Sequence, residues 1–348
     1  MDTIIKKIDC NNIDNSIIEQ AGDILKKGGL VAFPTETVYG LGGNALDKSA
    51  ASKIYEAKGR PSDNPLIVHI GRMEALDVLA KDVPKEAFVL AKEFWPGPLT
   101  MIFKKKDIVP DEITGGLDTV AIRMPNHPVA LELINKSNVY IAAPSANTSG
   151  RPSPTLASHV CEDMNGRIDM IIDGGEVGIG IESTIIDMTS DTPVILRPGY
   201  ITYNMLDKLL NKVDIDKAIL AENKDKNYVP KAPGMKYRHY APKAEMFIVT
   251  GKQDNVVDAI NSYANKNDEK VGIIATVETA DRYLYGTVKT IGSRNDEISI
   301  SQGLYKVLRE FDELDVDIIY TESFMNEDFG QSIMNRLYKA AGYKIIEV

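Results

Sequence analysis

The spacing of apolar residues in the first two hundred positions predicts alternating helices and buried strands. Ile17, Ala21 and Leu25 recur at helical spacing, and Gly28 follows them as a C-terminal stop signal. Short apolar runs that predict buried strands occur at 30–33, 66–68, 99–103, 119–123, 139–143, 185–188 and 194–196. Helices are expected at about 47–57, 84–95 and 204–210. This alternation is typical of an α/β fold.

The last hundred residues repeat the alternation at a smaller scale. Apolar runs at 246–249, 271–275, 288–291 and 318–320 predict strands, with helices at 255–264, about 304–314 and 331–341. The pattern predicts a small parallel sheet with helices on its faces. We find no clustered reactive residues along this part and interpret it as a support or docking domain. The predicted division is therefore a domain at 1–212, a linker at 213–245 and a second domain at 246–348.

Polar and glycine-rich segments follow several of the predicted strands. The strand at 30–33 is followed by PTETVYGLGG, which holds two threonine hydroxyls, one carboxylate and three glycines. Ligands of open α/β sheets bind at the carboxyl ends of strands, and the glycines would let backbone N–H groups approach an anion. A structural turn with a threonine cap is the alternative for this segment.

The segment 58–69, KGRPSDNPLIVH, is the most informative stretch of the chain. Its glycine and two prolines end the preceding helix and fix the backbone. Lys58 supplies a point charge and Arg60 a planar fork, a combination suited to a triphosphate. A surface loop with solvated cations is the alternative. His69 ends the strand that follows, where it would orient a substrate, accept a proton, or hydrogen-bond the backbone in a purely structural role.

Four further strand ends carry hydroxyl groups or cations. Alternation in 119–123 places Thr119 and Arg123 on one face, and a half-buried arginine there requires an anion, either a ligand or a structural carboxylate. Hydroxyl groups or cations also occur in the loops at 143–153 and 182–184 and at the end of the strand at 194–196. Neither a P-loop nor a dinucleotide-binding fingerprint is present in the sequence. We therefore expect one anion-binding site assembled from several strand ends.

A basic segment, 230–242, joins the two predicted domains. It contains three prolines together with Lys236, Tyr237, Arg238, His239 and Tyr240. An extended tether is one interpretation. Because a tether needs neither tyrosines nor that density of cations, a strap over an anionic ligand is the other.

Composition narrows the class of protein. The net charge of −10 argues against a general nucleic-acid binder. Cys10 and Cys161 are the only cysteines, which excludes a disulfide framework or a cysteine zinc site and fits a reducing, cytoplasmic location. No apolar run is long enough to span a membrane, and the first ten residues lack the core of a signal peptide. The single Trp95 is expected in the core.

Several motifs, in order, resemble the YrdC/Sua5 family. They are PTETVYGLG at 34–42, KGRPSDNPLIVH at 58–69, WPGPLT at 95–100, AIRMP at 121–125, APSANTSGRPSPT at 143–155, ESTIID at 182–187, LRPG at 196–199 and GMKYRHYAP at 234–242. The last is similar to the linker of the long, two-domain Sua5 type. The resemblance implies a YrdC-like twisted α/β catalytic domain, joined by an extended linker to a smaller Rossmann-like α/β C-terminal (Sua5) domain.

The resemblance also implies an activity. Family members are L-threonylcarbamoyladenylate synthases, nucleotidyltransferases that make threonylcarbamoyl-AMP and pyrophosphate from L-threonine, bicarbonate and ATP. A separate transferase complex then moves the threonylcarbamoyl group to adenosine 37 of ANN-decoding tRNAs, giving t6A. Mg²⁺ is expected to arrive with ATP and not on named protein ligands. A weak direct contact with tRNA stays open.

Carried over position by position, the resemblance divides the site residues into two sets. Lys58 and Arg60 are expected to be catalytic. The ATP set comprises Lys58, Arg60, Asn64, Thr119, Ser145, Ser153, Arg197 and Tyr237, with Tyr240 as the alternative linker tyrosine and Thr119 at the boundary between the two ligands. The L-threonine set comprises Thr35, His69, Arg123, Ala143 and Ser183. Ala143 carries no hydroxyl, so its side chain offers the amino acid no hydrogen bond.

Other functions are weighed against this one. An RNA-binding module would show steep salt dependence of binding, and the net charge speaks against it. A carbamoyltransferase acting on carbamoyl phosphate, as in YrdC-like domains of hydrogenase maturation factors, would carry a Cys-rich zinc segment for which two lone cysteines leave no room. A structural protein would leave the polar strand ends unexplained.

Overall fold

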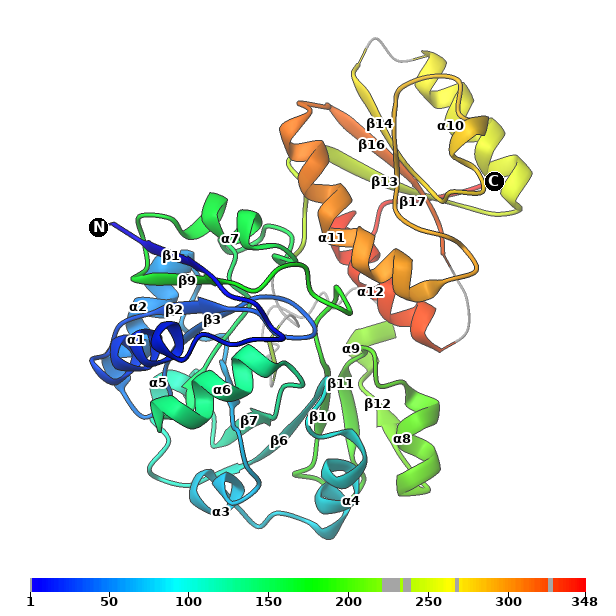
Figure 1. The fold of residues 1–348 in the computed structure, drawn as a ribbon. Coiled ribbons are helices and arrows are strands. Elements are labelled where there is room, and N and C mark those ends of the chain that lie inside the picture. The colour runs from blue at the N-terminus through cyan, green and yellow to red at the C-terminus, as the bar shows by residue number, and fades with distance from the viewer. Residues whose placement is uncertain (1, 221–231, 234–238, 267–268, 325–327) are drawn as a thin grey trace. The chain divides into compact units, whose positions relative to one another are not determined.

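The computed structural model describes residues 2–220, 232–233, 239–266, 269–324 and 328–348, and helices and strands alternate along them (Figure 1). The chain forms two compact units. The first comprises 1–149, 153–178 and 182–236, and the second comprises 150–152, 179–181 and 237–348. The main division, after residue 236, falls inside the predicted linker.

One mixed sheet organises the described part of the first unit. Its strands run in the order β1 (Ile4–Lys7), β9 (Met170–Asp173), β2 (Val31–Phe33), β3 (Gly40–Asn44), β8 (Ile141–Ala142), β4 (Ile67–His69), β7 (Thr119–Arg123), β6 (Leu99–Lys105), β10 (Thr184–Asp187), β11 (Val194–Arg197) and β12 (Asp214–Ile215), and β5 (Ala80–Lys81) pairs with β6. The expected α/β fold class is confirmed, although the sheet mixes parallel pairs such as β4–β7 with antiparallel pairs such as β6–β7.

The helices of the first unit cover the sheet and enclose two apolar cores. They are α1 (Asn15–Lys26), α2 (Lys48–Lys58), α3 (Ala75–Leu79), α4 (Lys85–Phe94), α5 (Asp111–Thr114), α6 (Pro128–Ser137), α7 (Ala157–Met164), α8 (Tyr203–Leu210) and α9 (Lys217–Leu220). α1 and α6 pack together over one core, which includes Ile18 and Leu133. Ile54 and Leu90 of α2 and α4 belong to the other. Each such fully buried side chain stabilises the fold by about 1.5–3 kcal/mol.

Local sequence explains where the helices begin and end. Asp14 and Asp47 cap α1 and α2 by accepting hydrogen bonds from the backbone N–H groups of Ser16 and Ser49. α2 ends at Gly59, whose φ of 59° is the left-handed conformation that glycine adopts without steric cost. Trp95 follows α4, is buried as expected and donates its indole N–H to the carbonyl of Leu99 at 2.7 Å.

The glycine segment 40–43 differs from its expected role. These residues form strand β3, paired with β2 and β8, and not a loop that presents N–H groups to an anion. Gly42 lies so close to its neighbours that a Cβ atom there would sit 2.7 Å from Ile141 Cγ2 and 2.8 Å from Phe33 Cε1. The glycines therefore serve close packing in the sheet.

We expect Gly42→Ala to lower the free energy of unfolding by about 1–3 kcal/mol, because the added methyl group overpacks a buried site. Gly178→Ala is the matched control, since the nearest atom to a Cβ there is 3.9 Å away. Urea unfolding followed by circular dichroism measures both. Equal stabilities of the two variants would contradict the close packing.

The second unit contains the small parallel sheet that the sequence predicts. Its order is β15 (Thr287–Thr290), β14 (Val271–Ala275), β16 (Ile318–Glu322), β13 (Glu245–Thr250) and β17 (Ile345–Glu347), and every pair is parallel. The helical elements are α10 (Gln253–Lys266), the 3₁₀ turn η1 (Ala280–Arg282), α11 (Glu297–Glu313) and α12 (Phe329–Ala340). The predicted strands and the helices α10 and α12 lie within about two residues of their expected positions, whereas α11 begins seven residues before the expected start at 304. The sequence analysis did not predict β17 or η1.

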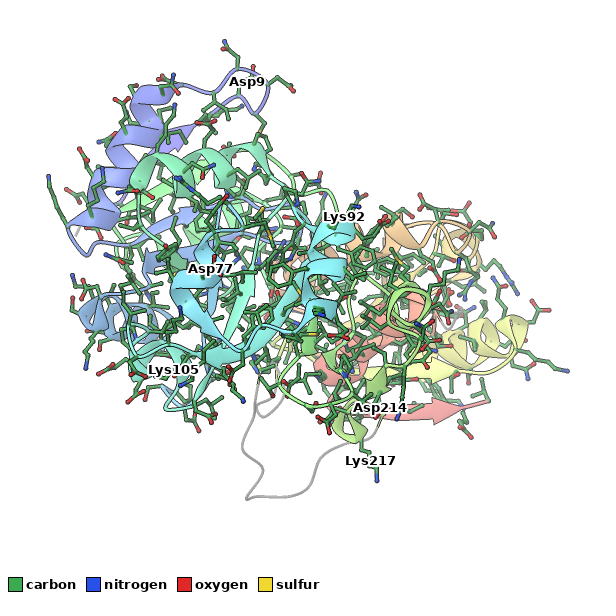
Figure 2. All side chains as sticks on the ribbon, turned by 90° about the horizontal axis from the view of Figure 1, so that it is seen from below. Asp9, Asp77, Lys92, Lys105, Asp214 and Lys217 are labelled. Carbon is green, nitrogen blue, oxygen red and sulfur yellow. The ribbon has the colours of Figure 1, made fainter. Side chains whose placement is uncertain are left out.

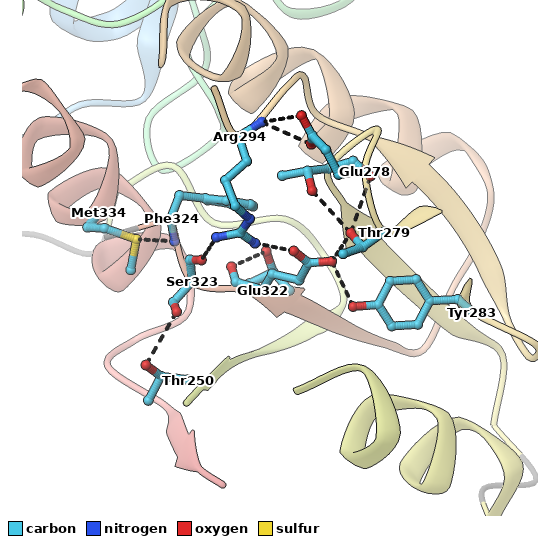
Figure 3. Close-up of polar contacts among 11 residues, drawn as sticks. Thr250, Glu278, Thr279, Tyr283, Arg294, Glu322, Ser323, Phe324 and Met334 are labelled. Carbon is cyan, nitrogen blue, oxygen red and sulfur yellow. Dashed lines mark hydrogen bonds and ion pairs between the residues drawn. The ribbon is translucent and has the colours of Figure 1, made fainter. Parts of the chain in front are cut away.

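A buried polar cluster in the second unit is absent from the sequence-based account (Figure 3). The carboxylate of Glu322, which is 1% exposed, accepts hydrogen bonds from Tyr283 (2.8 Å) and Thr279 and pairs with Arg294. Burial, followed by the charge of Glu322, raises the pKa of the Tyr283 hydroxyl. Because these donors satisfy the carboxylate, we interpret the cluster as a structural clamp between the ends of β14 and β16.

Charged side chains lie on the outside of the first unit. Figure 2 labels several of them, and Asp77, Lys92, Asp214 and Lys217 are exposed. Among the described residues, no helix is both long and apolar enough to cross a bilayer. Cys10 and Cys161 are both free thiols.

Candidate functional site

Two parallel strands, β4 and β7, separate the predicted site residues into two groups. Their register pairs Ile67 with Ala121 and His69 with Arg123, so the last two lie side by side at the carboxyl ends. Thr119 lies four residues earlier on β7, which places it about 13 Å from Arg123 along the strand. The carboxyl ends therefore hold residues of the predicted threonine set, and the amino ends face the predicted phosphate ligands.

Lys58 ends α2 and reaches into the loop that follows β8. The residue is 1% exposed, and its ammonium group donates to the carbonyls of Ser145 (2.5 Å) and Asn147. The Lys58 carbonyl in turn accepts from the N–H of Ser149 at 2.8 Å. Two predicted ATP-set residues, Lys58 and Ser145, are thus brought together, with the lysine charge held at the loop.

Arg60 braces the approach to β4. Its Nη2 donates to the carbonyls of Asn64 (3.2 Å) and Pro65 (3.1 Å), just before the strand begins at Ile67. Asn64 is 2% exposed, and its amide oxygen has no hydrogen-bond partner among the described residues. Arg60 and Asn64 therefore form a local unit in which the Asn64 amide oxygen can still accept a hydrogen bond.

Arg123 is buried at the end of β7 and is surrounded by the segment 35–37. Its Nη1 donates to Thr37 Oγ1 at 3.0 Å, and that oxygen lies 2.9 Å from Thr35 Oγ1. Its Nη2 lies 2.8 Å from Glu36 Oε1. The sequence left open whether Arg123 faces a ligand or a structural carboxylate. In this structure a carboxylate of the protein is beside it.

His69 is a buried, neutral imidazole. Its Nδ1 is 3.1 Å from the carbonyl of Ile67, and its ring meets Phe33 edge-on with centroids 6.2 Å apart. Burial, reinforced by the Arg123 charge, lowers the pKa of His69 to about 3. The backbone contact that the structural alternative required is present. At neutral pH the ring serves as a hydrogen-bonding group and only as a weak base.

This buried histidine predicts a pH dependence of stability. The unfolded chain protonates His69 below pH 6.5, the ordinary value, whereas the folded chain does so only near pH 3. Stability is therefore complete above pH 6.5 and falls as pH drops from 6.5 toward 3, by up to about 1.4 kcal/mol per pH unit. We expect His69→Gln to shrink the loss between pH 7 and pH 5 by about 2 kcal/mol in urea titrations. An unchanged loss would mean that the imidazole is protonated in the folded protein.

A second group of predicted residues surrounds Ser183, immediately before β10. Arg197 at the end of β11 donates from Nε to the Ser183 carbonyl (3.0 Å) and from Nη2 to its hydroxyl (3.2 Å). The Ser183 hydroxyl is 2.8 Å from Thr100 Oγ1, and Thr100 pairs with Arg123 in the sheet. Ser153 donates to Glu182 at 2.6 Å. The hydroxyls of Ser183 and Thr100 thus link Arg197 to the strand position beside Arg123.

Thr119, expected at the boundary between the two ligands, stays a prediction, and its position on β7 is what the structure adds. Thr119 lies at the far end of β7, away from the threonine set, because the strand is five residues long. Arg197 and Ser183, assigned to different ligands, touch each other directly.

The remaining predicted residues have simpler surroundings. Ala143 is buried in the apolar core with Phe33 and Ile141, and its N–H donates to Ile67. Tyr237 lies outside the described residues. Tyr240 belongs to the second unit, where it is buried and stacks on Tyr305 at 5.2 Å, so it is a core side chain.

An apolar strip lies between the two polar ends of the strands. Ile67, Ala121 and Leu196 belong to it, and Ala232 of the predicted linker packs against them, fully buried. The neighbouring carbonyl of Pro233 lies 3.5 Å from Arg197 Nη1. Part of the linker therefore packs on the site in the first unit. Within the described ranges, no group of three or more His, Cys, Asp or Glu side chains is arranged to hold a metal ion.

Sequence reasoning assigned no role to four residues of this network, namely Glu36, Thr37, Thr100 and Glu182. Each lies within one of the family motifs given above, but its residue type alone did not indicate a role in the site. The pairing of β6 with β7 and the packing of segment 35–37 against Arg123 bring them into the site.

Comparison with known proteins agrees with this architecture. A family model for Sua5/YciO/YrdC, described as telomere recombination, matches residues 23–199. A second, described as the C-terminal domain of threonylcarbamoyl-AMP synthase, matches residues 201–342. This chain belongs to the Sua5 family. Because both models match in order, it is of the long, two-domain type.

Named relatives resemble the chain over nearly its whole length. The threonylcarbamoyl-AMP synthase of Pyrococcus abyssi is 50% identical over 335 residues, covering 95% of this chain and 96% of that protein. That of Bacillus subtilis is 49% identical, covering 94% of each. The crystal structure of P. abyssi Sua5 complexed with L-threonine superposes with a TM-score of 0.94 at 49% identity, covering 99% of this chain and 100% of that one.

Proposed function

We infer that this chain is a threonylcarbamoyl-AMP synthase, which converts L-threonine, bicarbonate and ATP into threonylcarbamoyl-AMP, pyrophosphate and water. The single observation that carries the inference is near-full-length identity of about one half to synthases of the same two-domain type. The site agrees chemically. The buried Lys58 and the partly buried Arg60 lie near one end of β4 and β7, whereas Arg123 and its threonine hydroxyls lie at the other.

The residues at the amino ends of the strands are proposed to bind MgATP. Lys58 and Arg60 neutralise the triphosphate, with the metal ion carried in by the substrate. Asn64 is proposed to contact the phosphates through its amide N–H group. The rest of the proposed ATP set is Thr119, Ser145, Ser153, Arg197 and Tyr237. Of these, Arg197 lies away from the amino ends, beside Ser183.

The residues at the carboxyl ends are proposed to bind L-threonine. Arg123 pairs with the carboxylate. Thr35, His69 and Ser183 are each next to Arg123 or to a neighbour of it and would hold the rest of the amino acid. A site that hydrogen-bonds a substrate hydroxyl rejects analogues that lack it. Ala143 contributes no side-chain hydrogen bond and serves as a wall.

The proposed mechanism needs positioning and charge neutralisation more than a protein nucleophile. Threonine and bicarbonate combine to a carbamate and water. A carbamate oxygen then attacks the α-phosphorus of ATP, the bond to the β-phosphate oxygen breaks, and pyrophosphate leaves. Lys58, Arg60 and Arg197 stabilise the charge that develops on the phosphates. Exclusion of water protects the mixed anhydride product.

The product is a reactive intermediate and requires an acceptor. We propose that a threonylcarbamoyl transferase complex consumes it, in the cytoplasm, to build t6A at position 37 of ANN-decoding tRNAs. A direct contact of this chain with tRNA would be weak, given the net charge of −10.

Pyrophosphate release tests the activity. We expect release only when ATP, bicarbonate and L-threonine are all present, with each omission returning the rate to background. Release with another amino acid would keep the chemistry and overturn the substrate. Release of pyrophosphate from ATP when carbamoyl phosphate replaces bicarbonate and L-threonine would favour the carbamoyltransferase. No release under any combination would overturn the synthase and call for a salt-dependent tRNA-binding assay.

A further inference from the structure

Glu36 is a carboxylate in the site for which the proposed mechanism has no use. It lies between Thr35 and Thr37, and its side chain is 12% exposed. Its Oε1 is 2.8 Å from Arg123 Nη2. Even so, neither oxygen of Glu36 nor Nη2 of Arg123 makes an aligned hydrogen bond to any described residue. The two charges are close, but their hydrogen-bonding capacity is unused.

A purely structural ion pair would be expected to look different. Buried arginine and carboxylate groups usually join through two parallel hydrogen bonds, because each charge loses its hydration on burial. Here the other nitrogens of Arg123 are occupied, with Nη1 on Thr37 Oγ1 at 3.0 Å and Nε on the Gly97 carbonyl at 3.4 Å. Nη2 and the Glu36 carboxylate therefore stay available for a ligand that carries both charges.

We propose that Glu36 binds the α-ammonium group of L-threonine while Arg123 binds its α-carboxylate. The two charged groups of an α-amino acid are attached to one carbon atom, so their partners in a protein must be neighbours, as Glu36 and Arg123 are. The proposal rests on the proposed function, which supplies the amino acid substrate. It makes Glu36 the residue that distinguishes an amino acid from a hydroxy acid.

The surroundings of Glu36 support this assignment. His127 is close enough to feel the Glu36 charge: burial lowers the pKa of His127, and Glu36 opposes that shift. His69 pairs with Arg123 in the sheet and is neutral at physiological pH. Arg123 is thus the fixed positive charge beside Glu36. Binding of the substrate carboxylate to Arg123 would leave the Glu36 carboxylate without that partner, and the ammonium group replaces it.

The test compares two ligands that differ only in this group. Isothermal titration of the full chain would use L-threonine and the 2,3-dihydroxybutyrate of the same configuration, in which a hydroxyl replaces the ammonium. We expect the wild type to bind threonine at least 100-fold more tightly than the hydroxy acid. In Glu36→Gln the threonine affinity falls at least 10-fold while the hydroxy acid affinity is unchanged or rises, so the discrimination collapses.

Two further variants keep the test decisive. Glu36→Asp retains the charge and should retain discrimination with weakened threonine binding, whereas the exposed Glu74→Gln should behave as wild type. Glu36→Gln that binds threonine as tightly as wild type, or more tightly, would overturn the proposal, because Glu36 would then only compete for Arg123. If the wild type binds no threonine at all, the proposed function fails instead.

Discussion

Lys58→Ala is expected to reduce pyrophosphate release by about two to three orders of magnitude, the usual effect of removing one preorganised charge from a transition state. The ammonium group of Lys58 is held by the carbonyls of Ser145 and Asn147, so its position is set before ATP binds. Threonine affinity should change by less than about twofold, because Arg123 and its partners lie at the opposite ends of β4 and β7 and interact independently.

Steady-state pyrophosphate release and threonine titration measure the two effects separately. Lys92→Ala, on the exposed face of α4, is the matched control for loss of a lysine. Arg60→Ala should share the loss of turnover, since its guanidinium braces the same approach to β4. A Lys58→Ala enzyme with near wild-type turnover would remove the lysine from the proposed mechanism. A large loss of threonine affinity would mean that the two ends of the site are coupled.

Arg123→Ala is expected to weaken threonine binding by more than about 100-fold, since truncating one member of a buried charge pair costs 2–5 kcal/mol. It should also lower the free energy of unfolding by about 3 kcal/mol, because Glu36 would be left buried beside no cation. Threonine titration and urea unfolding measure the two consequences on one protein.

The double variant Arg123→Ala/Glu36→Gln separates binding from stability. Glu36→Gln removes the carboxylate charge that Arg123→Ala leaves unpaired, so it should restore most of the lost free energy of unfolding. The effects of the two substitutions on stability are then non-additive, while threonine binding stays lost. Additive stabilities would contradict a direct interaction between Arg123 and Glu36. Recovery of threonine binding in the double variant would mean that Arg123 does not bind the substrate carboxylate.

The second unit was the easier part to predict from sequence. Each strand–helix–strand unit there is local, and a right-handed parallel crossover leaves few arrangements for five strands. The first unit mixes parallel and antiparallel pairs, as in β4–β7 and β6–β7, and their partners lie far apart along the chain. Hydrophobic runs locate such strands but do not say which ones pair.

The glycines of β3 illustrate the same limit within one motif. From sequence, Gly40, Gly42 and Gly43 suited an anion-binding loop as well as a strand. Close contact of Gly42 with Ile141 and Phe33 decided for the strand, because only an absent side chain fits between them. The sequence shows that a residue is a glycine and lacks a side chain. It does not show which neighbours pack so closely that they require one.

By itself the sequence determined the family, the α/β class and most of the chemistry of the site. Motifs such as KGRPSDNPLIVH and APSANTSGRPSPT contain the cations, hydroxyls and amides from which the site is built. Only the tertiary structure decided which groups meet. Strand register put His69 beside Arg123, and packing of the strand ends joined Arg197 to Ser183. It also placed Glu36 against Arg123. The physical reason is that the pairing of charges and hydroxyls is set by distances across the sheet, and those distances depend on which distant strands pair.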